Sequence, residues 1–146
     1  MDHRSRTHRP RGYNDPGHAH ELTCSCYRRL PLLSKERVCQ WLANAIDAAR
    51  QELNYSVWAY VFMPDHIHLI VWPRDREYDD SDFLSRFKEP VSRQSMQYLK
   101  QHAPDWLTRL EAKRGKRIEH HFWQPGRGYP RSRCAVRSAI AVVRKD

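Results

Sequence analysis

The sequence predicts an α+β domain in which antiparallel strands are combined with amphipathic helices. Two apolar runs within residues 57–74 flank the break Met63-Pro64-Asp65, and their Val, Ile, Trp and Tyr content is typical of adjacent antiparallel strands. Residues 34–53 instead repeat apolar side chains every three or four positions, as a helix with one buried face does. At 146 residues, the chain suits a single domain that buries a proper core.

The chain is expected to begin with a basic arm, residues 1–17, followed by one domain, residues 18–146. The arm lacks apolar periodicity and holds two prolines and two glycines, which predicts a mobile segment. The first strand is expected at His20–Leu30. Its residues Leu22, Cys24 and Cys26 share one face, because strand side chains alternate.

In the sequence, helices are expected before and after the strand pair at residues 57–74. Ser34 is a plausible N-cap for the helix over residues 34–53. A polar loop follows at residues 73–81 and should end in a helix cap at Asp80 or Ser81. Pro90 should break or kink the next helix, and a second stretch is expected over residues 91–101. The chain's last residues read as a short helix with three inward-facing apolar side chains, Val136, Ile140 and Val143.

His66 and His68 are the candidate metal ligands. On a strand they leave the same face about 7 Å apart, close enough for both to reach one divalent cation. The spacing also fits two ordinary surface histidines, because a three-residue pattern is common. Asp75, Glu77, Asp79 and Asp80 in the following loop are interpreted as solvated rather than as ligands.

Positive charge is concentrated in two segments of a chain whose net charge is +9. Clustered cations suit a protein that binds the phosphate backbone of a nucleic acid, although solvated arms on a soluble basic protein are the alternative. In residues 109–133 the cations interleave with Phe122, Trp123 and Tyr129, as in proteins that stack bases on aromatic rings. Trp123 fits a core position equally well. The candidate nucleic-acid-binding residues are Arg4, Arg6, Arg9, Arg11, Lys113, Arg114, Lys116, Arg117, Arg127, Arg131 and Arg133.

Cysteine spacing and hydropathy predict a cytoplasmic protein. The four cysteines lack the paired spacing of a zinc ribbon and are interpreted as free thiols in a reducing compartment. No run of about 20 apolar residues is present, and the N-terminus is polar and arginine-rich.

The chain resembles the REP-associated tyrosine transposases, a branch of the single-tyrosine, IS200-like HUH transposases. The resemblance runs through P-G-H-A-H-E-L-T-C-S-C-Y, M-P-D-H-I-H-L-I-V and F-W-Q-P-G-R-G-Y, over roughly residues 16–130. It implies a ferredoxin-like antiparallel sheet of four to five strands with helices packed on one face. It also implies Mg²⁺ or Mn²⁺ on the histidine pair, cutting and rejoining of single-stranded or hairpin DNA through a 5′-phosphotyrosine, and a homodimer.

The family's tyrosine is not found where the resemblance places it. Its position falls near Val142, and no Asn-Pro-Val follows. We therefore expect a truncated or degenerate C-terminus and identify no catalytic nucleophile. Tyr98 and Tyr129 are the nearby substitutes, but neither matches, and Tyr98 fits the packing boundary of a helix. The alternative functions are a catalytically inactive nucleic-acid-binding remnant of the family and a metal-dependent hydrolase of small phosphoesters.

Overall fold

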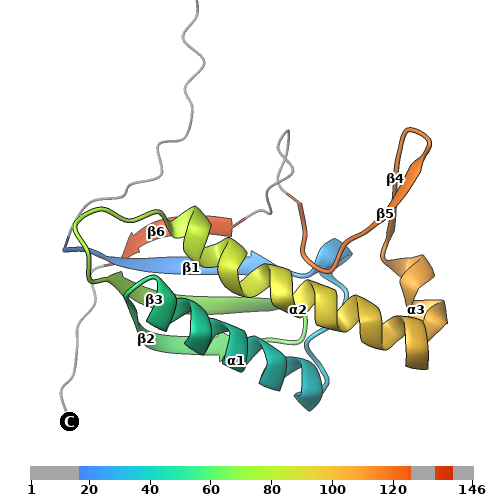
Figure 1. Ribbon diagram of the computed structural model, residues 1–146, viewed down its shortest axis with the longest axis horizontal. Coiled ribbons are helices and arrows are strands. Elements are labelled where there is room, and N and C mark those ends of the chain that lie inside the picture. The colour runs from blue at the N-terminus through green and yellow to red at the C-terminus, as the bar shows by residue number, and fades with distance from the viewer. Residues whose placement is uncertain (1–16, 126–133, 140–146) are drawn as a thin grey trace, which may run out of the picture.

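The computed structural model describes residues 17–125 and, for the backbone alone, residues 134–139. Its main sheet has four antiparallel strands in the order β2-β3-β1-β6. The strands are β1 (Ala19–Ser25), β2 (Tyr55–Phe62), β3 (His66–Pro73) and β6 (Cys134–Ala139). Two long helices, α1 (Glu36–Glu52) and α2 (Asp80–His102), connect them (Figure 1).

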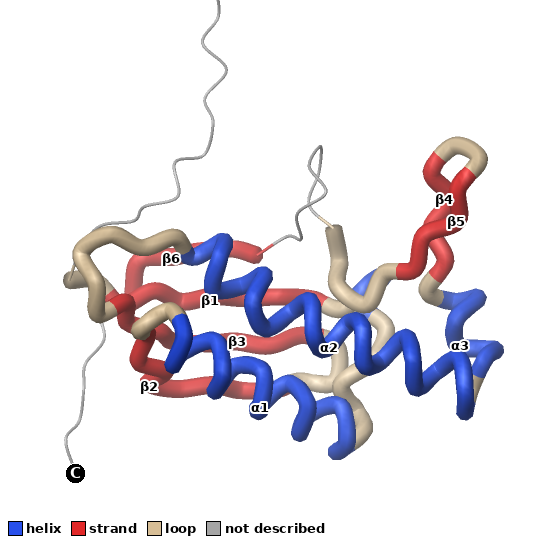
Figure 2. Tube along the Cα trace, viewed as in Figure 1, coloured by secondary structure: helices blue, strands red, loops and turns tan. Residues whose placement is uncertain are grey.

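Both long helices pack on the same face of the sheet (Figure 2). The core lies between the two layers, where the inward side chains of β1 and β3 alternate with side chains on the opposite face. Its fully buried members include Leu22, Leu42, Ile67, Leu69, Val71, Phe83 and Phe87. The element order β1-α1-β2-β3-α2-β6 with this strand order is the ferredoxin-like arrangement, so the predicted fold class is confirmed.

The predicted hairpin at residues 57–74 is present as β2 and β3. The turn between them is closed by a hydrogen bond of 2.8 Å from the Met63 amide to the His66 carbonyl. A register shift between Val57 and Ala59 interrupts the pairing, and β2 forms one edge of the sheet. Along β3 the buried and partly exposed residues alternate, which fixes the two histidines on the face away from the helices.

The first strand is shorter than predicted. It ends at Ser25, because Arg28 and Arg29 adopt positive φ angles of 53° and 56° in a short 3-10 turn, η1 (Tyr27–Arg29). The amides beyond the strand find partners outside the β3 ladder: the Tyr27 amide donates to the Phe122 carbonyl at 2.8 Å. The turn therefore ties the end of β1 to the segment around residue 122.

The helix boundaries differ from the predictions at both caps. Ser34 does not cap α1, since its hydroxyl donates to the Pro31 carbonyl at 2.9 Å. Asp79, rather than Asp80 or Ser81, caps α2 by accepting the Ser81 amide at 2.8 Å. α2 continues through Pro90, so the two predicted helical stretches are one helix of 23 residues. Of the break or kink predicted at Pro90, the break was wrong, since packing against α1 and the sheet outweighs the lost hydrogen bond.

After α2 the chain forms a small separate unit. The helix α3 (Pro104–Arg109) leads into a two-stranded hairpin, β4 (Glu111–Arg114) and β5 (Arg117–His120). Figure 1 shows this hairpin extending away from the sheet and the long helices. The segment that follows returns to the core, where Trp123 is buried and its indole N–H donates to the Lys88 carbonyl at 3.0 Å. Trp123 is thus a core residue.

The helix predicted for the chain's last residues was wrong where the structure describes them. Residues 134–139 form the strand β6, in which Val136 pairs with Leu22 of β1. A strand here supplies hydrogen-bond partners for the free edge of β1, which a helix would leave unpaired. Ile140 and Val143 lie outside the described residues. Over the described ranges, none of the helices has the length and apolar character needed to span a membrane.

Candidate metal centre and nucleic-acid interface

His66 and His68 lie together on the sheet face that the helices leave open. Their ring centroids are 4.9 Å apart, with the ring planes at 85°. Both side chains are partly exposed, 18% for His66 and 42% for His68. The structure therefore brings the two predicted ligands together and leaves solvent access to both.

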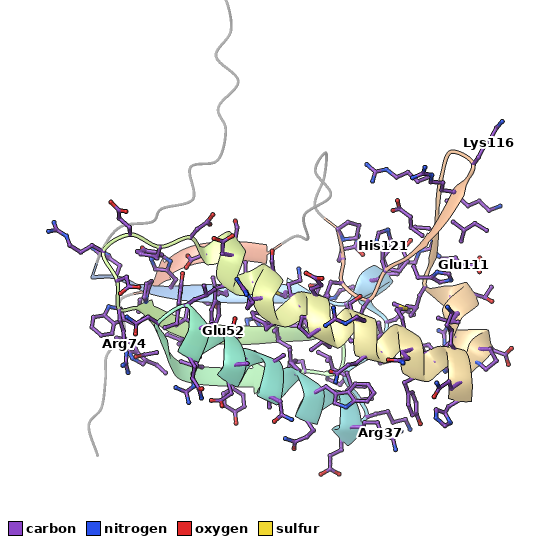
Figure 3. The ribbon with its side chains drawn as sticks, in the orientation of Figure 1. Arg37, Glu52, Arg74, Glu111, Lys116 and His121 are labelled. Atoms are coloured by element: carbon purple, nitrogen blue, oxygen red, sulfur yellow. The ribbon has the colours of Figure 1, made fainter. Side chains whose placement is uncertain are left out.

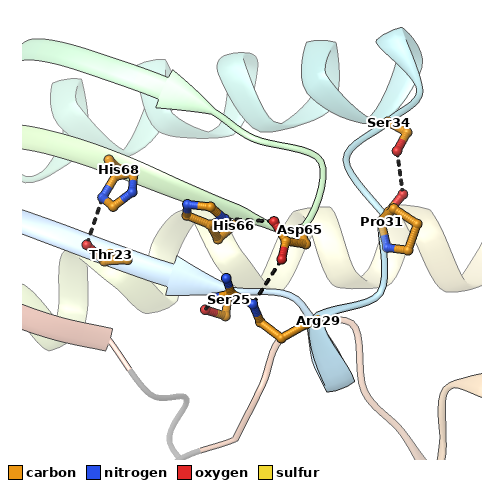
Figure 4. A network of polar contacts seen from close by, with 8 residues as sticks. All are labelled: Thr23, Ser25, Arg29, Pro31, Ser34, Asp65, His66 and His68. Carbon is orange, nitrogen blue, oxygen red and sulfur yellow. Dashed lines mark hydrogen bonds and ion pairs between the residues drawn. The ribbon is translucent and has the colours of Figure 1, made fainter.

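Each ring is oriented by an oxygen atom at its Nδ1 (Figure 4). The Asp65 carboxylate lies 2.7 Å from His66 Nδ1, and the Thr23 hydroxyl lies 3.0 Å from His68 Nδ1. Because a carboxylate only accepts hydrogen bonds, His66 Nδ1 carries the proton, and the neutral ring has its lone pair on Nε2. The Glu21 carboxylate, 3.7 Å from His68 Nδ1, favours the same tautomer there.

Asp65 is held in place from a second side. Arg29 donates from its Nε to the other carboxylate oxygen at 2.9 Å, and its Nη1 donates to the Ser25 hydroxyl at 3.1 Å. The hydrogen bond from His66, followed by the charge of Arg29, lowers the pKa of the Asp65 carboxyl. Asp65 is therefore ionised at neutral pH and keeps His66 oriented, as carboxylates do beside many metal-binding histidines.

The spacing of the two rings fits two ligands of one ion. With metal–nitrogen bonds of about 2.1 Å, each ring centroid lies about 3.2 Å from the ion. At bond angles of about 90° to 109°, two such centroids are about 4.5 to 5.2 Å apart. The observed 4.9 Å lies inside this range. The geometry thus suits two coordination positions on a divalent cation.

The described residues do not complete a metal site. Among the side chains of residues 17–125, no group of three or more His, Cys, Asp or Glu converges. The acidic loop before α2 is engaged elsewhere: Asp75 accepts from Asn54 at 2.8 Å, and Asp79 caps the helix. The prediction that this loop is solvated was wrong for Asp80, whose carboxylate is buried against His20. Remaining coordination positions would have to be filled by water, DNA or other donors.

A third histidine, which the sequence analysis did not single out, lies on the opposite face of the same sheet. His20 is 1% exposed and is paired through Nδ1 with the buried carboxylate of Asp80. Its Nε2 lies 3.0 Å from the Tyr78 hydroxyl, and the Tyr55 hydroxyl donates to Asp80 at 2.9 Å. Burial raises the pKa of the Tyr55 phenol, which therefore stays protonated. This cluster joins β1, β2 and the start of α2.

The signal for this cluster was present in the sequence but weak. Every second residue of a strand lies on the same face, so His20 shares the buried face of Leu22 and Cys24. This alternation alone placed a titratable ring in the core. A buried imidazole needs a partner, yet nothing local in the sequence identifies Asp80 as that partner. Asp80 was predicted as a helix cap instead.

The candidate DNA-binding residues fall into three groups. Lys113, Arg114, Lys116 and Arg117 are exposed and surround the tip of the β4–β5 hairpin, with Lys116 pointing away from the body of the domain (Figure 3). The arm residues Arg4, Arg6, Arg9 and Arg11 lie outside the described residues, as do Arg127, Arg131 and Arg133.

Of the two tyrosines considered as substitutes for the nucleophile, the structure describes only Tyr98. Tyr98 packs on α1: its ring centroid is 6.0 Å from that of Trp41, and the Arg37 guanidinium lies 4.5 Å from its centre. This is the packing role expected from its sequence context. Tyr129 and Val142 lie outside the described residues.

Comparison with known proteins identifies the class of protein. The family model described as "Transposase IS200 like" matches residues 16–144. A candidate transposase from Deinococcus radiodurans R1 has a similar fold, with a TM-score of 0.59 and 17% identity over 91% of this chain and 86% of that one. A REP-associated tyrosine transposase bound to a REP hairpin is also similar, with a TM-score of 0.55 and 21% identity.

The second of these structures covers 93% of this chain, but this chain spans only 64% of that protein. No curated protein matches the chain. The two structural likenesses establish a shared fold, and the family match covers nearly the whole sequence. The domain is therefore a transposase-type domain. The chain belongs to the IS200-like transposase family.

Proposed function

We propose that this chain is a DNA-cutting and DNA-rejoining transposase of the REP-associated type. In this proposal His66 and His68 hold Mg²⁺ or Mn²⁺ beside a phosphodiester of single-stranded or hairpin DNA. The observation that carries it is the pair of partly exposed imidazoles, whose centroids are 4.9 Å apart and which are both oriented through Nδ1. Within the described ranges, neither Nε2 has a hydrogen-bond partner, so both lone pairs are available to an ion.

The surrounding residues have defined roles in this site. Asp65 and Thr23 orient the two rings through their contacts with Nδ1, which leaves Nε2 of each ring for the ion. Arg29, 60% exposed and bonded to Asp65 through Nε, places positive charge next to His66 and can attract a phosphate. A bound divalent cation would supply the charge that stabilises developing negative charge on the phosphate oxygens.

The basic residues are proposed to hold the DNA around this site. The hairpin cations are exposed and point into solvent, and the arm and the segment after residue 125 add seven arginines to the proposed contacts. Each neutralised phosphate releases counterions, so removing contacts should reduce the salt dependence of binding. Deletion of residues 1–12 is expected to flatten the slope of log K against log salt; an unchanged slope would exclude the arm from the interface.

Cleavage of a hairpin oligonucleotide in the presence of Mn²⁺ tests the proposal. We expect His66→Ala and His68→Ala each to abolish Mn²⁺-stimulated cleavage while DNA binding remains. The matched control is His102→Ala, which removes an exposed histidine from the end of α2. Normal cleavage by both site variants would refute the metal assignment.

One observation favours a second function. Residue 142, where the family tyrosine is expected, is valine. A catalytically inactive, DNA-binding remnant of the family would bind hairpin DNA and Mn²⁺ without cutting. A denaturing gel distinguishes the two functions, because the transposase forms a covalent protein–DNA adduct and the remnant does not.

We further propose a homodimer, as expected from the family, which light scattering with and without DNA would test.

A further inference from the structure

The β4–β5 hairpin has a shape that the general DNA-binding proposal does not use. It is a two-stranded ribbon that stands away from the domain (Figure 1). Its turn consists of Gly115 and Lys116. Gly115 has a φ of 63°, as tight two-residue hairpin turns require at their first position, and nothing lies within 4 Å of the place a Cβ would occupy. The tip is therefore narrow and fully accessible.

Cations project from both faces of this ribbon. Lys113 pairs with Ile118 across the strands, and Arg114 pairs with Arg117. Because paired residues share a face and successive residues alternate, Lys113 lies on one face while Arg114 and Arg117 lie on the other. Lys116 extends from the tip of the hairpin (Figure 3).

Most of this charge is not neutralised by the protein. Arg114 lies 3.9 Å from Glu119, but Lys113, Lys116 and Arg117 have no ion pair with any residue in the described part of the chain. A flat phosphate surface would engage cations on one face of a ribbon and leave the other face unused. Cations on both faces instead match two rows of phosphates, one on each side of the ribbon.

We propose that the β4–β5 hairpin enters the major groove of double-stranded DNA, in the stem next to the strand that is cut. The major groove of B-form DNA is about 12 Å wide and admits a two-stranded ribbon, whereas the minor groove is about 6 Å wide and does not. Strands of four residues give the hairpin a length of about 13 Å, enough for its tip to reach the floor of a groove about 8.5 Å deep. Ile118, 57% exposed, adds an apolar side chain that can contact a thymine methyl group.

This inference rests on the proposed function for the presence of DNA, but it makes its own prediction. The hairpin should recognise duplex geometry, and the single strand should be held elsewhere. Duplex RNA should be a poor ligand, because its major groove is too deep and narrow for side chains to reach the bases. Equal binding of DNA and RNA duplexes of one sequence would overturn the inference.

The test uses the full chain with Lys113→Gln, Lys116→Gln and Arg117→Gln combined. A control variant with Lys35→Gln, Arg76→Gln and Lys100→Gln removes the same charge from exposed positions on the body of the domain. For a hairpin oligonucleotide, we expect the first variant to reduce the steepness of log K against log salt by about 2 to 3, since each lost phosphate contact contributes about 0.9. Binding of a stemless oligonucleotide should change no more than in the control.

Protection of guanine N7 from methylation detects protein bound in the major groove, because N7 lies in that groove. We expect the wild type and the control to protect stem guanines and the hairpin variant to lose that protection. Retained protection in the hairpin variant would refute the inference. A wild type that protects the stem through this hairpin but shows no metal-dependent cleavage would refute the proposed cutting activity and leave the groove contact standing.

Discussion

The two faces of the sheet use the same residue type for opposite purposes. On the covered face, His20 is buried and both ring nitrogens are engaged, by Asp80 and Tyr78. On the open face, His66 and His68 are engaged at Nδ1, and each has its other nitrogen available within the described part of the chain. An imidazole with both nitrogens satisfied by protein is part of the structure, whereas one with a single oriented nitrogen can bind a ligand.

The largest expected effect on stability comes from the covered face. His20→Ala removes one partner of a buried pair and leaves the Asp80 carboxylate without its imidazole, which costs about 3 kcal/mol of unfolding free energy. Tyr55→Phe deletes a single hydrogen bond to the same carboxylate and should cost about 1 kcal/mol. Urea denaturation measures both.

His66→Ala, on the open face, should change the free energy of unfolding by less than about 1 kcal/mol. A loss as large as that of His20→Ala would contradict the distinction between the two faces.

On the open face, the next effect concerns metal affinity. Asp65→Asn replaces the carboxylate that fixes the His66 tautomer with an amide, and we expect Mn²⁺ affinity to fall about 10- to 100-fold. Calorimetric titration provides the measurement. Asp75→Asn is the control, because Asp75 is an exposed carboxylate that contacts Asn54 rather than a histidine. Unchanged affinity in Asp65→Asn would mean that Asp65 does not orient a metal ligand.

The smallest effect is a pH dependence on the covered face. Burial raises the pKa of the Cys26 thiol from 9.0 to about 12. Between these values the unfolded chain has released the proton and the folded chain has not, so stability falls as pH rises. We expect the wild type to lose about 1 kcal/mol more than Cys26→Ala between pH 7 and pH 10. Equal losses would show that the thiol is not shielded as the structure indicates.

The sequence predicted the parts of the fold that depend on local pattern. The alternation around His66 and His68 placed both rings on one face, and the repeat in residues 34–53 produced α1. The resemblance supplied the ferredoxin-like arrangement. The shared face of the two rings and the helix α1 follow from side-chain periodicity, which can be recognised within a single segment.

The failed predictions depended on contacts between distant segments. Val136 belongs to a strand because β1 offers an unpaired edge, and Pro90 sits within a helix because that helix packs along α1 and buries one face in the core. Asp80 is buried because His20, sixty positions earlier, needs a partner. In each case a tertiary contact outweighed a local preference that the sequence expressed correctly.

Mn²⁺ binding to the isolated full chain tests the central claim most directly. The loss of the free Mn²⁺ signal in electron paramagnetic resonance, measured without DNA, should show saturable binding of one ion per chain in the wild type. That binding should weaken at least about tenfold in His66→Ala and in His68→Ala, and persist in His20→Ala where the variant remains folded. Saturable binding that survives the combined His66→Ala and His68→Ala substitutions would contradict the account.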